Sequence, residues 1–302
     1  MINLEDIEKI YLKLKNTKGG KNADYIPELK KVNPNLYSIS IFTVDGYEYD
    51  IGDYDTKFAI QSCSKVFTLA LALEKFGIPA LKSKIGTHKS YEKFNSIHAI
   101  ENDKTHTINP FDNGGAMATT SLLYEKTKTK TSIEKQIIDN MSKYAGTQLH
   151  VDKKIYLSEI TNAEHNLAIA YLLKSYDRFY ADVDKTVDVY TKQCSVMVTT
   201  SELAVMAATL ANKGVNPKTN KKVIDAKFIP YILEQMVNNG LYEESDNWFK
   251  SVGLPAKSGV GGLLMIVIPG LMGIAIASPP LNSHGNSVKG IKTAKLIAGL
   301  LK

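Results

Sequence analysis

The sequence predicts an α+β protein in which both ends of the chain build one antiparallel sheet and a helical segment lies between them. Strand-like alternation occurs near the N-terminus and returns beyond residue 242, whereas most of the segment between has helical periodicity. Because no linker separates these segments, we expect one functional unit made of three stretches. Residues 1–64 and 241–302 are expected to form a sheet lobe flanked by helices, and residues 65–240 a central all-helical lobe.

The N-terminal elements are a helix and a hairpin. Apolar residues recur at helical spacing over Leu4–Leu14, directly after Asn3, which is a favourable N-cap. Residues 37–43 alternate as a strand does, Asp45-Gly46 supplies a tight turn, and residues 47–51 return.

The later elements follow the same logic. Residues 64–76 predict a helix with one apolar face, and most segments from there to about Met236 look helical. The apolar runs 260–267 and 271–277 predict two buried strands joined by a turn. Residues 288–301 predict a final helix, which completes the sheet lobe.

The composition of the 302-residue chain is ordinary for a globular protein, with 44% hydrophobic and 23% charged residues. A formal charge of +6 is a weak bias, and the densest basic stretch, Lys126, Lys128 and Lys130, has no aromatic residues to stack on bases. Two cysteines, Cys63 and Cys194, are too few for a disulfide framework. No secretory signal or membrane-spanning run is present, so we expect a cytoplasmic protein without membrane or nucleic-acid partners.

One motif carries the chemistry. Ser62 and Lys65 lie three residues apart at the start of a predicted helix, so both side chains share one face. A lysine that burial keeps uncharged could take the serine proton, beside helix N–H groups that stabilise an oxyanion. Lys257-Ser258-Gly259 precedes a predicted strand, and Ser-x-x-Lys with Lys-Ser/Thr-Gly is typical of penicillin-binding proteins and serine β-lactamases. Their third motif is missing in plain form, and no histidine has metal-ligand spacing.

A closer resemblance extends over nearly the whole chain, in order and at consistent spacing. It is carried by residues 23–29, 58–67, 109–116, 158–166, 190–195, 240–242, 253–262 and 278–287. With these stretches the chain resembles the serine-dependent glutaminase family, a branch of the β-lactamase-like fold. It departs from the family pattern at Gly114, at His165 where the family usually has Arg, at Leu263, and around His88–Tyr91.

The resemblance implies hydrolysis of L-glutamine to L-glutamate and ammonia through a serine–lysine acyl-enzyme. Ser62 is then the nucleophile, Lys65 the base, and Tyr242 the proton relay, with Tyr190 left as the alternative relay. The backbone N–H groups of Ser62 and Val260 are expected to form the oxyanion hole.

Further roles follow from the same resemblance. Asn113, Glu159, Asn166 and Tyr190 are expected to hold the amino-acid end of glutamine, since a carboxylate suits an α-ammonium and amides suit a carboxylate. Lys257 either lowers the pKa of the relay tyrosine or is structural, and Tyr25 is expected to close the site. No cofactor or metal is expected, and the family implies a homodimer or homotetramer.

Less specific interpretations stay open at this point. Ser62 could be a helix N-cap, Lys65 a surface lysine, Glu159 a charge on a helix face, and the two tyrosines packing residues. The same scaffold also suits a penicillin-recognising enzyme or esterase, and a binding protein that senses an amino acid without turnover would need no nucleophile and base.

Overall fold

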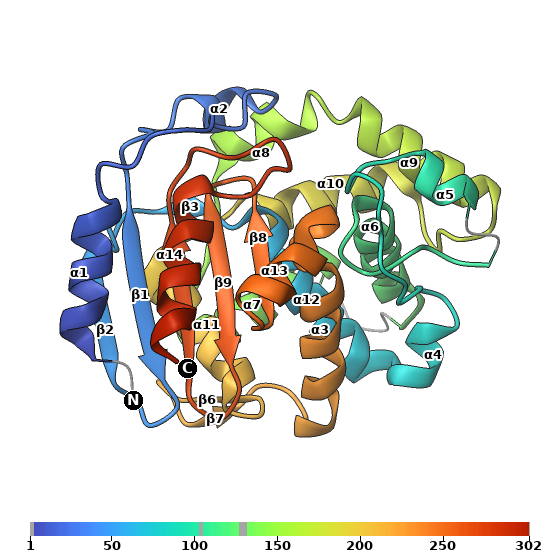
Figure 1. Ribbon diagram of the computed structural model, residues 1–302. Helices are drawn as coiled ribbons and strands as arrows, with labels where there is room; N and C mark the ends of the chain where they lie inside the picture. The colour runs from blue at the N-terminus through green and yellow to red at the C-terminus, as the bar shows by residue number, and fades with distance from the viewer. Residues whose placement is uncertain (1–2, 103–104, 127–131, 302) are drawn as a thin grey trace.

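The protein folds around one antiparallel sheet that joins its two ends. The computed structural model describes residues 3–102, 105–126 and 132–301. Its main sheet has five strands in the order β2-β1-β10-β9-β8, so the two N-terminal strands lie directly beside the three C-terminal strands and meet them at the β1–β10 pair. Figure 1 shows this sheet beside the helices that occupy the middle of the chain. The predicted α+β class, with one antiparallel sheet from both ends, is confirmed.

The elements have the following bounds. The strands are β1 (Ser38–Thr43), β2 (Glu48–Gly52), β3 (Phe58–Ala59), β4 (His150–Val151), β5 (Val196–Val198), β6 (Val215–Asn216), β7 (Lys221–Lys222), β8 (Ala256–Gly259), β9 (Leu263–Ile268) and β10 (Met272–Ala277). The α-helices are α1 (Leu4–Leu14), α2 (Pro27–Lys30), α3 (Ser64–Phe76), α4 (Ile78–Lys82), α5 (His98–Asn102), α6 (Asn113–Leu122), α7 (Ile133–Ala145), α8 (Lys153–Ile160), α9 (Glu164–Ser175), α10 (Val183–Cys194), α11 (Thr200–Ala211), α12 (Ile229–Asn239), α13 (Ser245–Ser251) and α14 (Val288–Leu300). Short 3₁₀ turns are η1 (Gln61–Cys63), η2 (Leu123–Lys126), η3 (Ala226–Phe228) and η4 (Tyr242–Glu244).

Both faces of the sheet are buried, which explains its continuous apolar strands. Successive side chains of a strand point to opposite faces. In β9, Leu263 and Met265 enter the core cluster shared with α11, whereas Leu264 and Ile266 enter the cluster shared with α1 and α14. Antiparallel sheets often leave one face to water, but here helices cover both.

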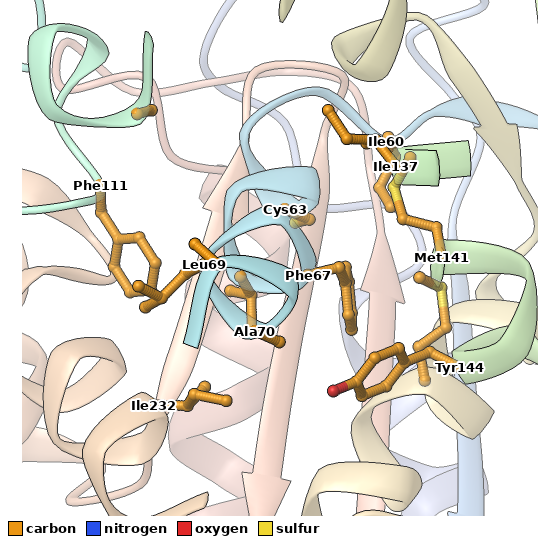
Figure 2. Packing of buried hydrophobic residues seen from close by; sticks show 14 of the residues in the cluster. Ile60, Cys63, Phe67, Leu69, Ala70, Phe111, Ile137, Met141, Tyr144 and Ile232 are labelled. Atoms are coloured by element: carbon orange, nitrogen blue, oxygen red, sulfur yellow. The ribbon is translucent and has the colours of Figure 1, made fainter. Parts of the chain in front are cut away.

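The helix α3 runs through the middle of the larger cluster. Figure 2 shows Cys63, Phe67, Leu69 and Ala70 pointing into apolar side chains from several other elements. Phe67 packs against the ring of Tyr144 on α7, with ring centroids 4.9 Å apart. Truncating a fully buried side chain of this kind costs about 3–5 kcal/mol, so the helix that follows Ser62 is held firmly.

Two sequence expectations about the C-terminal strands need correction. The strand expected at 260–267 begins at Leu263, because residues 260–262 form a turn. Ahead of this turn lies a strand that the sequence did not predict, β8, which contains Lys257 and Ser258 and pairs with β9.

Three further expectations concern the lobe boundaries, the basic stretch and membrane-spanning helices. The lobe boundaries at 64 and 240 stay a prediction; α11, from the middle segment, packs on the main sheet. Of the basic stretch, Lys128 and Lys130 lie outside the described residues. Within the described ranges no helix has both the length and the apolar character needed to cross a bilayer.

Candidate active site

The turn that carries Ser62 is an irregular connection between β3 and α3. Ser62 is the middle residue of η1 and is 7% exposed. The residue before it, Gln61, has a φ of 47°, a left-handed conformation that costs a non-glycine residue about 1–3 kcal/mol and that is enriched at functional sites. The N-cap position of α3 is Cys63 and makes no side-chain cap, so Ser62 is not the helix cap.

Lys65 lies in the first turn of α3 and is almost fully buried, with 1% of its surface exposed. Its Nζ donates to the carbonyl oxygen of Phe111 at 2.9 Å and to Oδ1 of Asn113 at 2.8 Å. Burial lowers the pKa of this amine to about 8, and the charges of Cys194, Asp112 and Glu159 oppose the lowering. The surface-lysine interpretation is therefore excluded. The spacing of Ser62 and Lys65 suggested that the amine could reach the hydroxyl. Between these two described residues, however, Nζ and Oγ form no hydrogen bond.

Asn113 joins three helices at the site. At the start of α6, its Oδ1 accepts from Lys65 and, at 3.3 Å, from the hydroxyl of Tyr190 on α10. Its Nδ2 donates to Oδ1 of Asn166 on α9 at 3.0 Å. The three predicted binding residues Asn113, Asn166 and Tyr190 thus form one connected network, although 77 positions separate Asn113 and Tyr190 in sequence.

Glu159 faces this network from the C-terminal part of α8. Its Oε2 accepts from Nε2 of Gln61 at 2.9 Å. Burial raises the pKa of the carboxyl to about 7, while the Gln61 hydrogen bond and the charge of Lys65 lower it. A carboxylate that is ionised near neutral pH inside a cavity can bind a cationic group, and Glu159 is not a charge on a solvated helix face.

Tyr242 stands over Lys65 from the 3₁₀ turn η4. Its φ of 55° is again left-handed, and its ring centroid lies 5.6 Å from Nζ of Lys65. The buried hydroxyl has no hydrogen-bond partner within the described chain, although Ser62 lies close enough to lower its pKa. Burial outweighs this effect and raises the pKa of Tyr242 above its usual value.

Lys257 is the second fully buried lysine of the site. Its Nζ lies 4.0 Å from the centroid of the Tyr242 ring and donates to the carbonyl oxygens of Gly240 and Ser258, each at 2.9 Å. Burial, aided by the charge of Lys65, lowers the pKa of Lys257 well below its usual value. Burial raises the pKa of Tyr242 above its usual value, and the expectation that the charge of Lys257 offsets part of this rise stays a prediction.

Val260 sits in the turn between β8 and β9, close against the Ser62 segment. A Cβ on the neighbouring Gly259 would lie 2.8 Å from the carbonyl oxygen of Ile60, and one on Gly261 would lie 2.5 Å from that of Ala59. Only glycine allows this approach, which brings the backbone of Val260 to the turn that carries Ser62.

Most predicted site residues line one cavity of about 100 Å³. Of the predicted set it is lined by Ser62, Asn113, Glu159, Asn166, Tyr190 and Val260. Lys65 and Tyr242 are not among its lining residues, and Nζ of Lys65 lies 5.6 Å from the centroid of the Tyr242 ring. The lining residues that sequence reasoning did not assign to the site are Gln61, Phe94, Asn95, Asn162, His165 and Cys194. Gln61 directly precedes the Ser62-x-x-Lys65 motif, but Phe94 and Asn95 belong to a loop without a sequence signal.

That loop forms the rim of the site. Phe94 packs on Tyr242 with ring centroids 4.9 Å apart, and its carbonyl oxygen accepts from the backbone N–H of Asn113 at 2.8 Å. Nε2 of His165, at one of the departures from the family pattern, contacts the carbonyl oxygen of Asn95 at 2.7 Å. An outer cavity of about 760 Å³ shares Tyr25, Phe94, Asn95 and Val260 with the inner one, so Tyr25 lies at the entrance between the two.

Comparisons with known proteins agree over nearly the full chain. A family model described as Glutaminase matches residues 20–302. A glutaminase of Colwellia psychrerythraea is 46% identical over 293 residues, covering 97% of this chain and 93% of the relative. A solved structure of a probable glutaminase, ybaS, has a TM-score of 0.94 at 44% identity, covering 98% of this chain and 96% of that one. Mglu, solved in a glutamate form, has a TM-score of 0.91 at 32% identity, covering 98% of this chain and 68% of that one.

Fold and site together define an α+β enzyme with the β-lactamase-like fold. The family match, the level of identity and the coverage are more specific than the fold. The chain belongs to the glutaminase family.

Proposed function

We propose that this enzyme hydrolyses L-glutamine to L-glutamate and ammonia, with Ser62 as the nucleophile. The observation that carries the proposal is a buried lysine amine with a pKa of about 8, one helical turn from a serine that lines a cavity. Membership of the glutaminase family supports glutamine as the substrate. The glutamate form of the relative Mglu supports glutamate as the product.

The chemistry divides into two displacements at one carbon. Oγ of Ser62 bonds to the side-chain amide carbon of glutamine, and its proton passes to the uncharged amine of Lys65, directly or through Tyr242. The carbonyl oxygen becomes negative and accepts from the N–H groups of Ser62 and Val260. The carbon–nitrogen bond then breaks, the nitrogen takes up the proton and leaves as ammonia, and a glutamyl ester remains. Water attacks the ester, which releases glutamate and returns the proton to Ser62.

The two tyrosines differ in a way that supports separate roles. The hydroxyl of Tyr190 donates to Asn113, whereas that of Tyr242 has no partner in the described chain and faces Ser62. A hydroxyl without a fixed partner can exchange a proton between Ser62 and Lys65. We therefore assign the relay to Tyr242 and substrate contact to Tyr190.

The amino-acid end of glutamine is assigned to cavity-lining side chains of α6, α8, α9 and α10. The carboxylate of Glu159 suits the α-ammonium, and the amides of Asn113 and Asn166 with the Tyr190 hydroxyl suit the α-carboxylate. Tyr25, at the entrance, is assigned to closure over the bound substrate. The predicted cytoplasmic location and homo-oligomeric state remain proposals, and light scattering of the purified protein tests the latter.

Ammonia release from glutamine by purified protein tests the proposal. Ser62→Ala is expected to lose at least about 10³-fold in kcat/KM while its fold is retained. The control Ser83→Ala, at an exposed serine outside both cavities, is expected to behave as wild type. Covalent labelling of Ser62 by a β-lactam without glutamine hydrolysis would favour a penicillin-recognising enzyme, and glutamine binding without ammonia release would favour a sensor.

A further inference from the structure

Gln61 touches three parts of the site that have separate proposed tasks. Along the chain it immediately precedes Ser62. Through its side-chain amide it donates to Oε2 of Glu159, 98 positions away. Its aliphatic stem packs on the turn around Val260, because a Cβ on Gly259 would lie 3.4 Å from its Cβ and one on Gly261 would lie 3.6 Å from its Cγ.

The backbone of Gln61 makes this junction sensitive to its side chain. Its φ of 47° is unfavourable for a residue with a Cβ, so surrounding contacts must hold it. Gln61 is only 3% exposed. Among the described residues, Glu159 is the side chain to which the Gln61 amide is hydrogen-bonded. A change at Glu159 is therefore transmitted to the residue that orients the Ser62 hydroxyl and N–H.

We propose that Gln61 is a positioning residue that couples occupation of the α-amine site at Glu159 to the geometry of the Ser62 turn and of the Val260 N–H. This inference rests on the proposed function, which assigns the substrate amine to Glu159. A substrate ammonium on the free oxygen of Glu159 fixes the carboxylate, the carboxylate fixes the Gln61 amide, and the amide holds the strained turn in its productive form. Binding of the α-amine, which is remote from the reacting carbon, then raises kcat for glutamine as well as its affinity.

The test compares two substrates that differ only in that amine. L-Glutamine and glutaramate, which is glutamine without its α-amino group, carry the same reacting amide. The main variant is Gln61→Met, which keeps the stem that packs on Gly259 and Gly261 and removes the N–H donor. Gln148→Ala, at an exposed glutamine outside the two cavities described above, is the control.

Coupling predicts a specific split in the kinetic constants. In Gln61→Met, kcat with glutamine should fall about tenfold or more, whereas kcat with glutaramate should stay within about twofold of wild type. A rise in KM alone would mean that Gln61 only orients Glu159, and equal losses with both substrates would mean that it only supports the turn. Either result, or no change, would overturn the proposal.

Glu159→Gln keeps the test decisive if Gln61→Met folds poorly, because it leaves Gln61 intact and should also lower kcat with glutamine. Where Gln61→Met folds, a double-mutant cycle adds to this test, and adding Gln61→Met to Glu159→Gln should cost little more. A loss in Glu159→Gln confined to KM, or strictly additive losses in kcat, would overturn the coupling. The proposed function fails separately, because it requires glutamine hydrolysis by wild type and its loss in Ser62→Ala.

Discussion

The chemistry of single residues in this enzyme depends on how far they are removed from water. Lys65 could be predicted from its spacing to Ser62, because three residues bring two side chains to one helix face. Its pKa could not be predicted, because the lowering comes from burial beneath segments that include Phe111 and Asn113, nearly fifty positions away. The link between Gln61 and Glu159 was hidden for the same reason: two polar residues nearly a hundred positions apart carry no mutual signal.

The pH dependence follows from two residues that work without a proton. Lys65, with a pKa of about 8, must be uncharged to act as a base, and Glu159, with a pKa of about 7, must be ionised to bind an ammonium. We therefore expect kcat/KM for glutamine to rise from pH 6 to pH 9, in two steps about these values. Glu159→Gln should remove the lower step. A kcat/KM that rises toward acid pH would contradict the assignment.

The hydroxyl of Tyr242 should matter for rate and little for stability. It has no hydrogen-bond partner in the described chain, so Tyr242→Phe should change the free energy of unfolding by less than about 1 kcal/mol. Loss of the relay should lower kcat by about 10²–10⁴-fold. Tyr144→Phe removes another buried, unpartnered hydroxyl, beside Phe67 and away from the cavity (Figure 2). This control should keep full activity, and equal activity of both variants would exclude Tyr242 as the relay.

The strand β8, which carries Lys257 of the site, could not be predicted from the sequence. The amphipathic helix α1 and the alternating strand β1 followed from periodicity. The strand β8 did not, because all four of its residues are buried and two of them, Lys257 and Ser258, are polar. Burial on both faces removes the alternation that marks a strand, and a buried lysine imitates a loop residue.

The close approach of the β8–β9 turn can be tested with one methyl group. A Cβ at Gly261 would lie 2.5 Å from the backbone oxygen of Ala59, so Gly261→Ala must move the turn away from Ser62. We expect a stability loss of about 1–3 kcal/mol and a fall in kcat of up to about 10³-fold as the Val260 N–H is displaced. Chemical denaturation and ammonia assays measure the two effects.

Gly299→Ala is the matched control for that substitution. The position lies in α14, and a Cβ there meets no atom within 4 Å. The same change should stabilise the protein by up to about 1 kcal/mol and leave kcat unchanged. If Gly261→Ala behaved like this control, the turn would not position an oxyanion donor.

The whole molecule unites segments that are far apart in the chain around one cavity. The sheet class could be predicted because strand signals cluster at both ends, and the antiparallel pairing of β1 with β10 is what joins those ends. The cavity could be predicted only through family resemblance, since its wall comes from η1, α6, α8, α9, α10 and the β8–β9 turn. Physical signals in the sequence are local, whereas the site is made by long-range packing.

Ligand binding should therefore stabilise the whole fold. With Ser62→Ala, which cannot turn glutamine over, glutamine at about 100 times its Kd should add about 2.7 kcal/mol to the free energy of unfolding. The thermal midpoint of this variant should rise with glutamine concentration, and Glu159→Gln added to it should abolish most of the shift. An identical shift in both proteins would remove Glu159 from the binding wall.

The central claim is that glutamine passes through a glutamyl ester on Ser62, and a partitioning experiment tests it most directly. Glutamine and the γ-methyl ester of glutamate would each be supplied with hydroxylamine, and the ratio of glutamyl hydroxamate to glutamate measured. Both substrates would form the same glutamyl ester, which no longer contains the leaving group, so we expect the same ratio from both. Ser62→Ala should form neither glutamyl hydroxamate nor glutamate. A ratio that differs between the substrates, or product formation by Ser62→Ala near the wild-type rate, would contradict the account.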